Sequence, residues 1–331
     1  MGGRDTNVDS LRGIACILLV TLHVSHSQWG AAGWLEWYAD TFTYIRMPLF
    51  AFLAGLVYAW RPLTDRALYG QFLSKKVRRL LVPYAIFVPA VGLAGILMGS
   101  PPEAGPLHWL LYSIAPYWFL LASFWVFAVV ALLDAFHLIE TPARVGILIG
   151  ALLLVNVTVD LEGSSHLLQL AQACYLGLFF VAGLAATRFD WRRTGLRGGI
   201  VMAIATLVLF AYTQVPVNGI WSYTSQRMDI LGIALGVAFP LAFLALGLSS
   251  RFLAWVGGYS SGIFLLHPFA ILASRFVLDK AGVDALIPSL LVTAALGIFG
   301  SILGVVLLRT FMAGRVALGE KARAPRETVA A

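Results

Sequence analysis

The chain has 331 residues, of which 60% are hydrophobic and only 12% are charged, and it contains ten tryptophans. This much apolar surface exceeds what one soluble core can hide, so the composition excludes a soluble globular domain and indicates a polytopic membrane protein. The net charge of +7 does not indicate a nucleic-acid partner, because its distribution follows the positive-inside pattern. All but four of the 23 Lys and Arg residues fall in alternate loops and the two ends of the chain; the four are Arg46, Arg227, Arg275 and Lys280.

Apolar runs long enough to cross a lipid bilayer recur along the chain. They cover residues 11–29, 43–60, 79–98, 117–136, 145–159, 167–186, 199–215, 229–247, 252–273 and 286–309, the ninth being interrupted at His267-Pro268. We therefore predict an all-α bundle of about ten transmembrane helices in the cell membrane, with both termini in the cytoplasm. Residues 1–314 would form the membrane domain. The polar stretch 315–331 is expected to be a disordered cytoplasmic tail.

The first apolar run carries a polar stripe. Arg12 and His23 are eleven residues apart, which on a helix is about 16 Å along the axis and within about 20° of the same face. Asp9 and Cys16 share that face, and His26 lies at its margin. Taken singly, an arginine here can be a flanking charge at the membrane surface, and a histidine can pair with a backbone carbonyl.

Two patterns of small residues predict close helix packing. They are Gly146-xxx-Gly150 and Gly232-xxx-Gly236, whose glycines lie on one face of their helices.

Four later segments extend the pattern that begins with Arg12 and His23. The whole set resembles, in the same order, the acyltransferase-3 family of membrane-embedded acyltransferases, most closely its fucose 4-O-acetylase-like branch. The later segments are Arg46 to Gly55 at the second run, Phe72 to Tyr84 before the third, Trp118-Phe119-Leu120 at the fourth, and Gly257 to Pro268 in the ninth. Three positions depart from the family pattern. Arg46 stands where the branch usually has His, Ala54 replaces Ser, and Phe264 replaces Tyr.

The resemblance implies acyl transfer from a cytosolic acyl-CoA, in particular acetyl-CoA, to a sugar hydroxyl. The enzyme would be an O-acetyltransferase that modifies an exported or cell-surface polysaccharide, or another carbohydrate or lipid-linked glycan acceptor. It would lie in the inner membrane if its source is bacterial. His23 would be the general base, because an imidazole with a pKa of about 6.5 can accept the proton of an attacking alcohol. Arg12 would bind the donor or pair with Asp9. We expect no metal and no tightly bound cofactor, acyl-CoA being a co-substrate.

The basic stretch before the third run has two interpretations. Lys76 and Arg79 match the family's basic positions and could bind the phosphates of acyl-CoA, whereas Lys75 and Arg78 are typical of topology anchors that contact anionic lipid.

Three further residues are candidate supporting groups. Trp118 could be an interfacial belt residue or part of an aromatic floor, and Ser261 matches the family's late motif. His267 could serve the site, but a histidine next to a helix-breaking proline can also satisfy the carbonyl that the proline leaves free.

A membrane carrier for a glycan or lipid-linked intermediate is the alternative function. It explains ten spans and polar histidines along a path, but it explains neither the spacing of Arg12 and His23 nor the basic stretch before the third run. No acidic residue lies clearly in the middle of any predicted span, as a proton-coupled carrier would ordinarily require.

Overall fold

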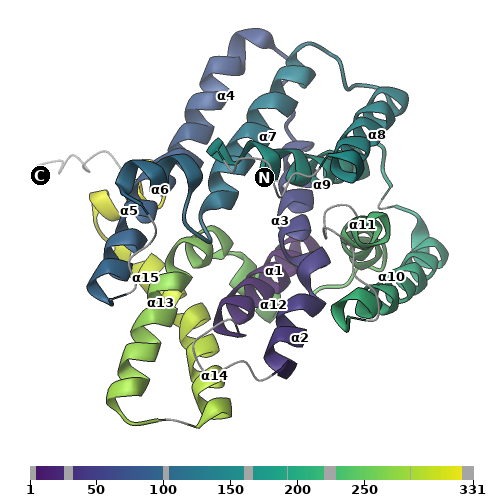
Figure 1. Cartoon of the computed structure of the whole chain (residues 1–331). Helices are drawn as coiled ribbons and strands as arrows, with labels where there is room; N and C mark the ends of the chain where they lie inside the picture. Colours follow the sequence, from purple (N-terminus) through teal and green to yellow (C-terminus); the bar gives the residue numbers. More distant parts are fainter. Residues whose placement is uncertain are drawn as a thin grey trace, which may run out of the picture.

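A computed structural model describes residues 5–25, 33–99, 104–159, 167–191, 193–219, 229–283 and 285–322. Within these ranges every regular element is helical, with no strand (Figure 1). Eight helical stretches are long and apolar enough to cross a membrane, and two shorter apolar helices, Pro142–Thr158 and Ile230–Ala245, accompany them among the described residues. The predicted all-α membrane bundle is therefore confirmed.

In chain order, the helices are α1 (Thr6–Ser25), α2 (Gly33–Thr41), α3 (Thr43–Tyr58), η1 (Arg66–Leu68), α4 (Tyr69–Lys76), η2 (Val77–Leu81), α5 (Val82–Leu97), α6 (Pro106–Tyr112), α7 (Trp118–Ala135), α8 (Pro142–Thr158), η3 (Leu167–Gln169), α9 (Leu170–Arg188), α10 (Gly195–Val217), α11 (Ile230–Ala245), α12 (Arg251–Gly257), α13 (Ser260–Lys280), α14 (Leu286–Ala295), η4 (Leu296–Gly300), α15 (Ser301–Leu308) and α16 (Met312–Ala317). Both η2 and η4 are π-helical turns.

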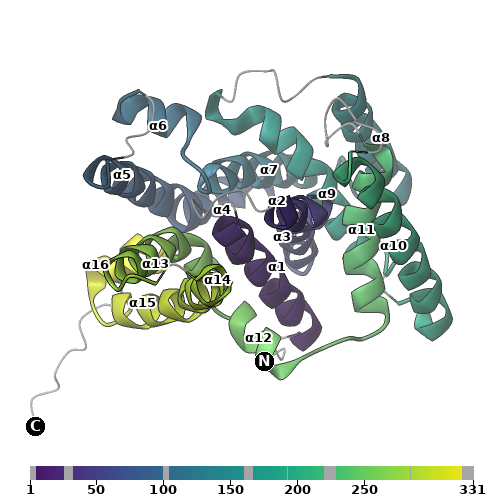
Figure 2. The same cartoon turned by 60° about the horizontal axis from the view of Figure 1, so that its bottom comes forward.

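Helix α1 lies in the middle of the bundle and contacts α3, α11, α12, α13 and α14 (Figures 1 and 2). Its first half packs on α12 with the two backbones in contact. A Cβ atom on Gly13 would lie 2.1 Å from the Leu253 carbonyl oxygen, and one on Gly257 would lie 1.9 Å from that of Asp9. Ser10 Oγ also donates to the Ser250 carbonyl oxygen at 3.1 Å. Only glycine fits at these contacts.

A second glycine crossing joins α3 to α9. Cβ atoms on Gly55 and Gly183 would lie 1.8 and 1.9 Å from the carbonyl oxygens of Phe180 and Phe52. This crossing fixes α3, which carries part of the site described below.

The two predicted small-residue patterns have different outcomes. Gly232 and Gly236 face the Tyr44 ring, Phe179 and Pro48 at contact distance, so that prediction is confirmed. A Cβ atom on Gly146 or Gly150 would meet no atom within 4 Å, so the prediction of close packing there was wrong. Their helix, α8, presents its glycines to the outside of the bundle.

The expected interruption at His267-Pro268 was also wrong. Helix α13 continues from Ser260 through Pro268 to Lys280, and the break lies earlier, at Gly258 and Tyr259. The helix tolerates Pro268 because another donor replaces the missing backbone N–H, as described below.

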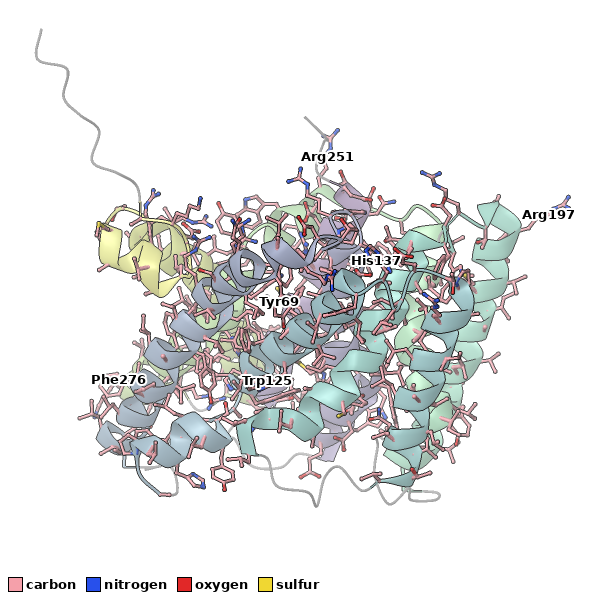
Figure 3. All side chains as sticks on the ribbon, turned by 90° about the horizontal axis from the view of Figure 1, so that it is seen from above. Tyr69, Trp125, His137, Arg197, Arg251 and Phe276 are labelled. Carbon is pink, nitrogen blue, oxygen red and sulfur yellow. The ribbon has the colours of Figure 1, made fainter. Side chains whose placement is uncertain are left out.

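Basic side chains mark one edge of the bundle. Figure 3 shows Arg197 and Arg251 at the same edge, and Phe276, near the end of α13, toward the opposite one. Since Ser250 binds Ser10, the beginning of α1 lies at the edge with Arg251. We call this edge, defined by Arg197 and Arg251, the basic edge.

The chain returns to the basic edge beyond residue 314. The predicted tail begins inside α16, Leu318 is 8% exposed, and Glu320 forms an ion pair with Arg309 at 2.7 Å. The start of the predicted tail, through Glu320, is therefore packed against the bundle rather than extended. The rest of the predicted tail, like Arg4 and His26, lies outside the described residues.

Candidate active site

A cavity of about 210 Å³ opens among the helices near the basic edge. Three of the predicted site residues, Arg12, Arg79 and Ser261, line it. Its remaining lining comes from α3, the π-helical turn η2, α7, α13 and the segment after α16. These residues are Phe50, Leu53, Ala54, Leu80, Phe119, Leu120, Ser123, Phe127, Ser260, Phe264, Leu265 and Leu318. Residues that are far apart in sequence thus form one site with a polar rim and an apolar interior.

Arg12 lies at the rim and is held by Asp9. Its Nη1 donates to Asp9 Oδ1 at 2.8 Å, while the Arg12 side chain keeps 28% of its surface exposed. Asp9 is almost fully buried, with a side chain that is 6% exposed. The predicted pairing is therefore present, and the Arg12 guanidinium still faces the cavity.

Lys76 and Arg79 reach the cavity in different ways. Lys76 ends α4, and its Nζ lies 3.2 Å from the centroid of the Phe127 ring, one of the lining residues. Arg79 lies in η2, is exposed, and lines the cavity directly. The π-helical turn precedes Pro83, which lacks a backbone N–H, and such turns recur at functional sites. Because this turn is π-helical, the spacing of a regular α-helix does not hold between Lys76 and Arg79.

Three phenylalanine rings close the inner end of the cavity. Phe50, Phe119 and Phe264 are in mutual contact, with centroid separations of 5.8 Å for Phe50–Phe119, 5.6 Å for Phe119–Phe264 and 6.5 Å for Phe50–Phe264. We call these three residues the phenylalanine triangle. Each comes from a different helix, α3, α7 or α13.

His267 lies one helical turn beyond the triangle and is fully buried. Its Nδ1 is 3.0 Å from the Phe264 carbonyl oxygen and 2.9 Å from that of Ile263. The Phe264 carbonyl is the one that Pro268 leaves without a backbone donor, so this predicted role of His267 is confirmed. Because carbonyl oxygens only accept, Nδ1 carries the proton and Nε2 has the lone pair. Nε2 is buried with no hydrogen-bond partner among the described residues.

His23 lies beside His267, with the two ring centroids 5.1 Å apart. It is partly buried and lies two residues before Ser25, the last described residue of α1; residues 26–29 of the predicted span lie outside the described residues. Arg275 Nη2 donates to the His23 carbonyl oxygen at 2.9 Å, which ties α13 to this turn. The first helix thus brings Arg12 to the cavity rim and His23 to the far side of the triangle.

Two other positions highlighted by the sequence lie outside the cavity. Trp118 is half-buried, and its ring packs edge-on against Phe119, one ring of the triangle, at 6.1 Å. Arg46 is 5% exposed, and its Nη2 has no hydrogen-bond partner in the described part of the chain.

Sequence reasoning missed two residues that hold this arrangement. Tyr117 is fully buried and donates its hydroxyl to the Leu265 carbonyl oxygen at 2.8 Å, which joins α7 to α13. Arg275 was counted only among the four basic residues that depart from the charge pattern. Tyr117 had a usable signal, since it directly precedes the Trp118-Phe119-Leu120 motif.

Comparison with protein families gives a match for residues 5–310, to the family model described as an acyltransferase domain, that of the acyltransferase-3 family. Neither the curated proteins nor the solved structures give a match.

Proposed function

Because this chain belongs to the acyltransferase-3 family, we propose that it is an acyl-CoA-dependent O-acyltransferase that acylates, and in particular acetylates, a sugar hydroxyl of a glycan. The fold and the family support a multi-pass membrane acyltransferase. The donor, the acceptor and the roles of single residues are the proposal.

One observation carries it. A cavity with Arg12 and Arg79 at its rim ends on the phenylalanine triangle, and the His267–His23 pair lies directly behind Phe264. Guanidinium groups bind phosphate oxygens with two parallel hydrogen bonds, so the rim suits the phosphates of CoA. The apolar interior suits the arm that carries the thioester.

His23 is the proposed general base. An imidazole nitrogen accepts the proton of the sugar hydroxyl while the hydroxyl oxygen attacks the thioester carbon. The tetrahedral intermediate collapses with cleavage of the C–S bond, and the imidazolium returns its proton to the CoA sulfur. The products are the O-acyl ester and free CoA, and base assistance of this kind contributes about 10²- to 10⁴-fold to the rate.

His267 is the proposed positioning residue. Its Nδ1–H is occupied by two carbonyl oxygens, so its Nε2 lone pair is available to orient the neighbouring His23 ring. An orienting acceptor selects which nitrogen of the base carries the proton.

Replacement of His23 tests the base. His23→Ala should remain folded and lose about 10²- to 10⁴-fold in kcat with labelled acetyl-CoA and a glycan acceptor. His137→Ala is the matched control, since His137 is exposed and pairs with Glu140 away from the cavity. A His23→Ala enzyme with full activity would refute the assignment.

The donor site is tested by the double substitution Lys76→Ala, Arg79→Ala. The Michaelis constant for acetyl-CoA should rise more than tenfold while the constant for the acceptor is unchanged, because each lost charge-assisted hydrogen bond is worth about 1.5–3 kcal/mol. Lys75→Ala is the control, as Lys75 is exposed at the end of α4. An unchanged constant for the donor would count against phosphate binding here.

The acceptor and the carrier alternative are separated by two measurements. Mass spectrometry of surface glycans from cells with and without the gene should reveal the missing acyl group. Purified protein should transfer the label from acetyl-CoA with no ion gradient present, whereas a carrier would not.

A further inference from the structure

The phenylalanine triangle separates the cavity from the histidine pair. Phe50 and Phe119 are half-buried and line the cavity, and Phe264 is 4% exposed. On the other side, the Phe264 ring lies 6.2 Å from the His267 ring, which in turn lies 5.1 Å from His23. This line of ring contacts connects the cavity wall to the histidines.

The direction of the three helices fixes the order of depth. On α13, Ser261, Phe264 and His267 follow at intervals of three residues, about 4.5 Å each, leading away from the basic edge. Helices α3 and α7 run the other way. Figure 3 shows that His137, just after the end of α7, lies nearer the basic edge than Trp125 in the middle of that helix, so α7 runs toward the basic edge. Tyr58 at the end of α3 donates to Asp134 at the end of α7, so α3 ends at the same level.

The rim and the triangle are therefore at different levels on every helix. Ala54 and Phe127 lie toward the basic edge, and Phe50 and Phe119 lie one to two turns deeper. A donor that enters from the basic edge meets the rim first and the triangle last.

We propose that the phenylalanine triangle limits the length of the acyl chain that this protein accepts. The inference rests on the proposed function, in which the thioester must come within reach of His23. With the phosphates held at the rim, the acyl group is the part of the donor that enters between the rings. The rings are already in contact, so every added methylene must displace more aromatic surface. Discrimination by one methylene in such a pocket is about 10- to 200-fold.

The test compares acetyl-CoA with butyryl-CoA as donors for the full-length purified protein. The wild type should have a kcat/KM for acetyl-CoA that is about tenfold or more above that for butyryl-CoA. Tenfold is the low end of the discrimination that one methylene gives in a tight pocket. Phe50→Leu, Phe119→Leu and Phe264→Leu should each raise the butyryl-to-acetyl ratio by about tenfold or more. Phe119→Trp should lower it.

The control is Phe179→Leu. Phe179 is a fully buried ring that packs on Tyr175 and does not line the cavity, so the ratio should stay at the wild-type value even if stability falls. Thermal unfolding of each variant in detergent reports whether it is folded.

The outcomes are distinguishable. A wild type that transfers from neither donor overturns the proposed function and, with it, this inference. A wild type that transfers from both donors equally well overturns the inference alone and needs no variant. An active wild type whose ratio is unaffected by Leu at all three positions, or is affected equally by Phe179→Leu, also overturns it.

Discussion

Replacement of Gly13 by alanine should damage both the stability and the activity of this protein. The new Cβ would lie 2.1 Å from the Leu253 carbonyl oxygen, whereas a carbon and a carbonyl oxygen approach to about 3.3 Å, so α12 must retreat by about 1.2 Å. Overpacking of this kind costs about 1–3 kcal/mol, and the better helix propensity of alanine offsets about 1 kcal/mol of it. The net loss of stability is up to about 2 kcal/mol.

The effect on activity should be larger than the effect on stability. Helix α12 leads directly into α13, which carries Ser261, Phe264 and His267, so its retreat from α1 moves His267 relative to His23. A misplacement of about 1 Å can cost about 10²-fold in rate. Thermal unfolding in detergent and acetyl transfer should be measured for Gly13→Ala and for Gly146→Ala, whose Cβ would meet nothing within 4 Å. Equal behaviour of the two variants would refute the idea that the α1–α12 contact positions the site.

Two further predictions concern the support of the site. Asp134→Asn should lower the free energy of unfolding by about 3–5 kcal/mol, because it removes the buried partner of Arg188 (2.8 Å) and weakens the hydrogen bond from Tyr58. The control is Asp190→Asn, in an exposed pair with Arg193, which should leave the unfolding temperature unchanged. Similar losses of stability for both variants would contradict the argument. A chain that ends at Ala317 should have a raised Michaelis constant for acetyl-CoA. It loses Leu318 from the cavity wall and the contact of Gly319 with the backbone of Arg78 and Arg79. A chain that ends at Ala322 keeps both contacts and should behave as wild type. Identical constants for the two truncations would show that the segment is not part of the donor site.

The membrane class and most helices could be predicted because apolar length is a local property of the sequence. The hydrogen bond of His267 to the Phe264 carbonyl was predictable for the same reason, because His267 directly precedes Pro268, the residue whose missing N–H leaves that carbonyl free. The short helices α2 and α6 were missed, because neither is long or apolar enough to stand out from a loop. The packed start of the tail was missed because Val316, Ala317 and Leu318 form only one short apolar stretch between charged residues.

The phenylalanine triangle could not be predicted because it exists only in the tertiary structure. Phe50, Phe119 and Phe264 are each surrounded by other apolar residues in their own helices, and nothing local distinguishes them from core residues such as Phe52. They meet because the glycine crossing of α3 on α9 and the Tyr117 bond to α13 place three helices at one level. The sequence showed that Phe264 stands where the family has Tyr, but it did not show that the Phe264 ring contacts Phe50 and Phe119.

The spacing of Arg12 and His23 acquires a physical meaning from this arrangement. Eleven residues of α1 span about 16 Å, which is the depth from the polar rim, past the apolar interior and the triangle, to the histidine pair. Under the proposed function, a donor held by its phosphates at the rim and reacting at His23 would have to bridge that depth, so the spacing of Arg12 and His23 on a rigid helix would match the length of the extended donor. Under the proposed function, the polar stripe on α1 would place the two ends of one binding site, and the length of the donor, rather than the thickness of the bilayer, would set its spacing.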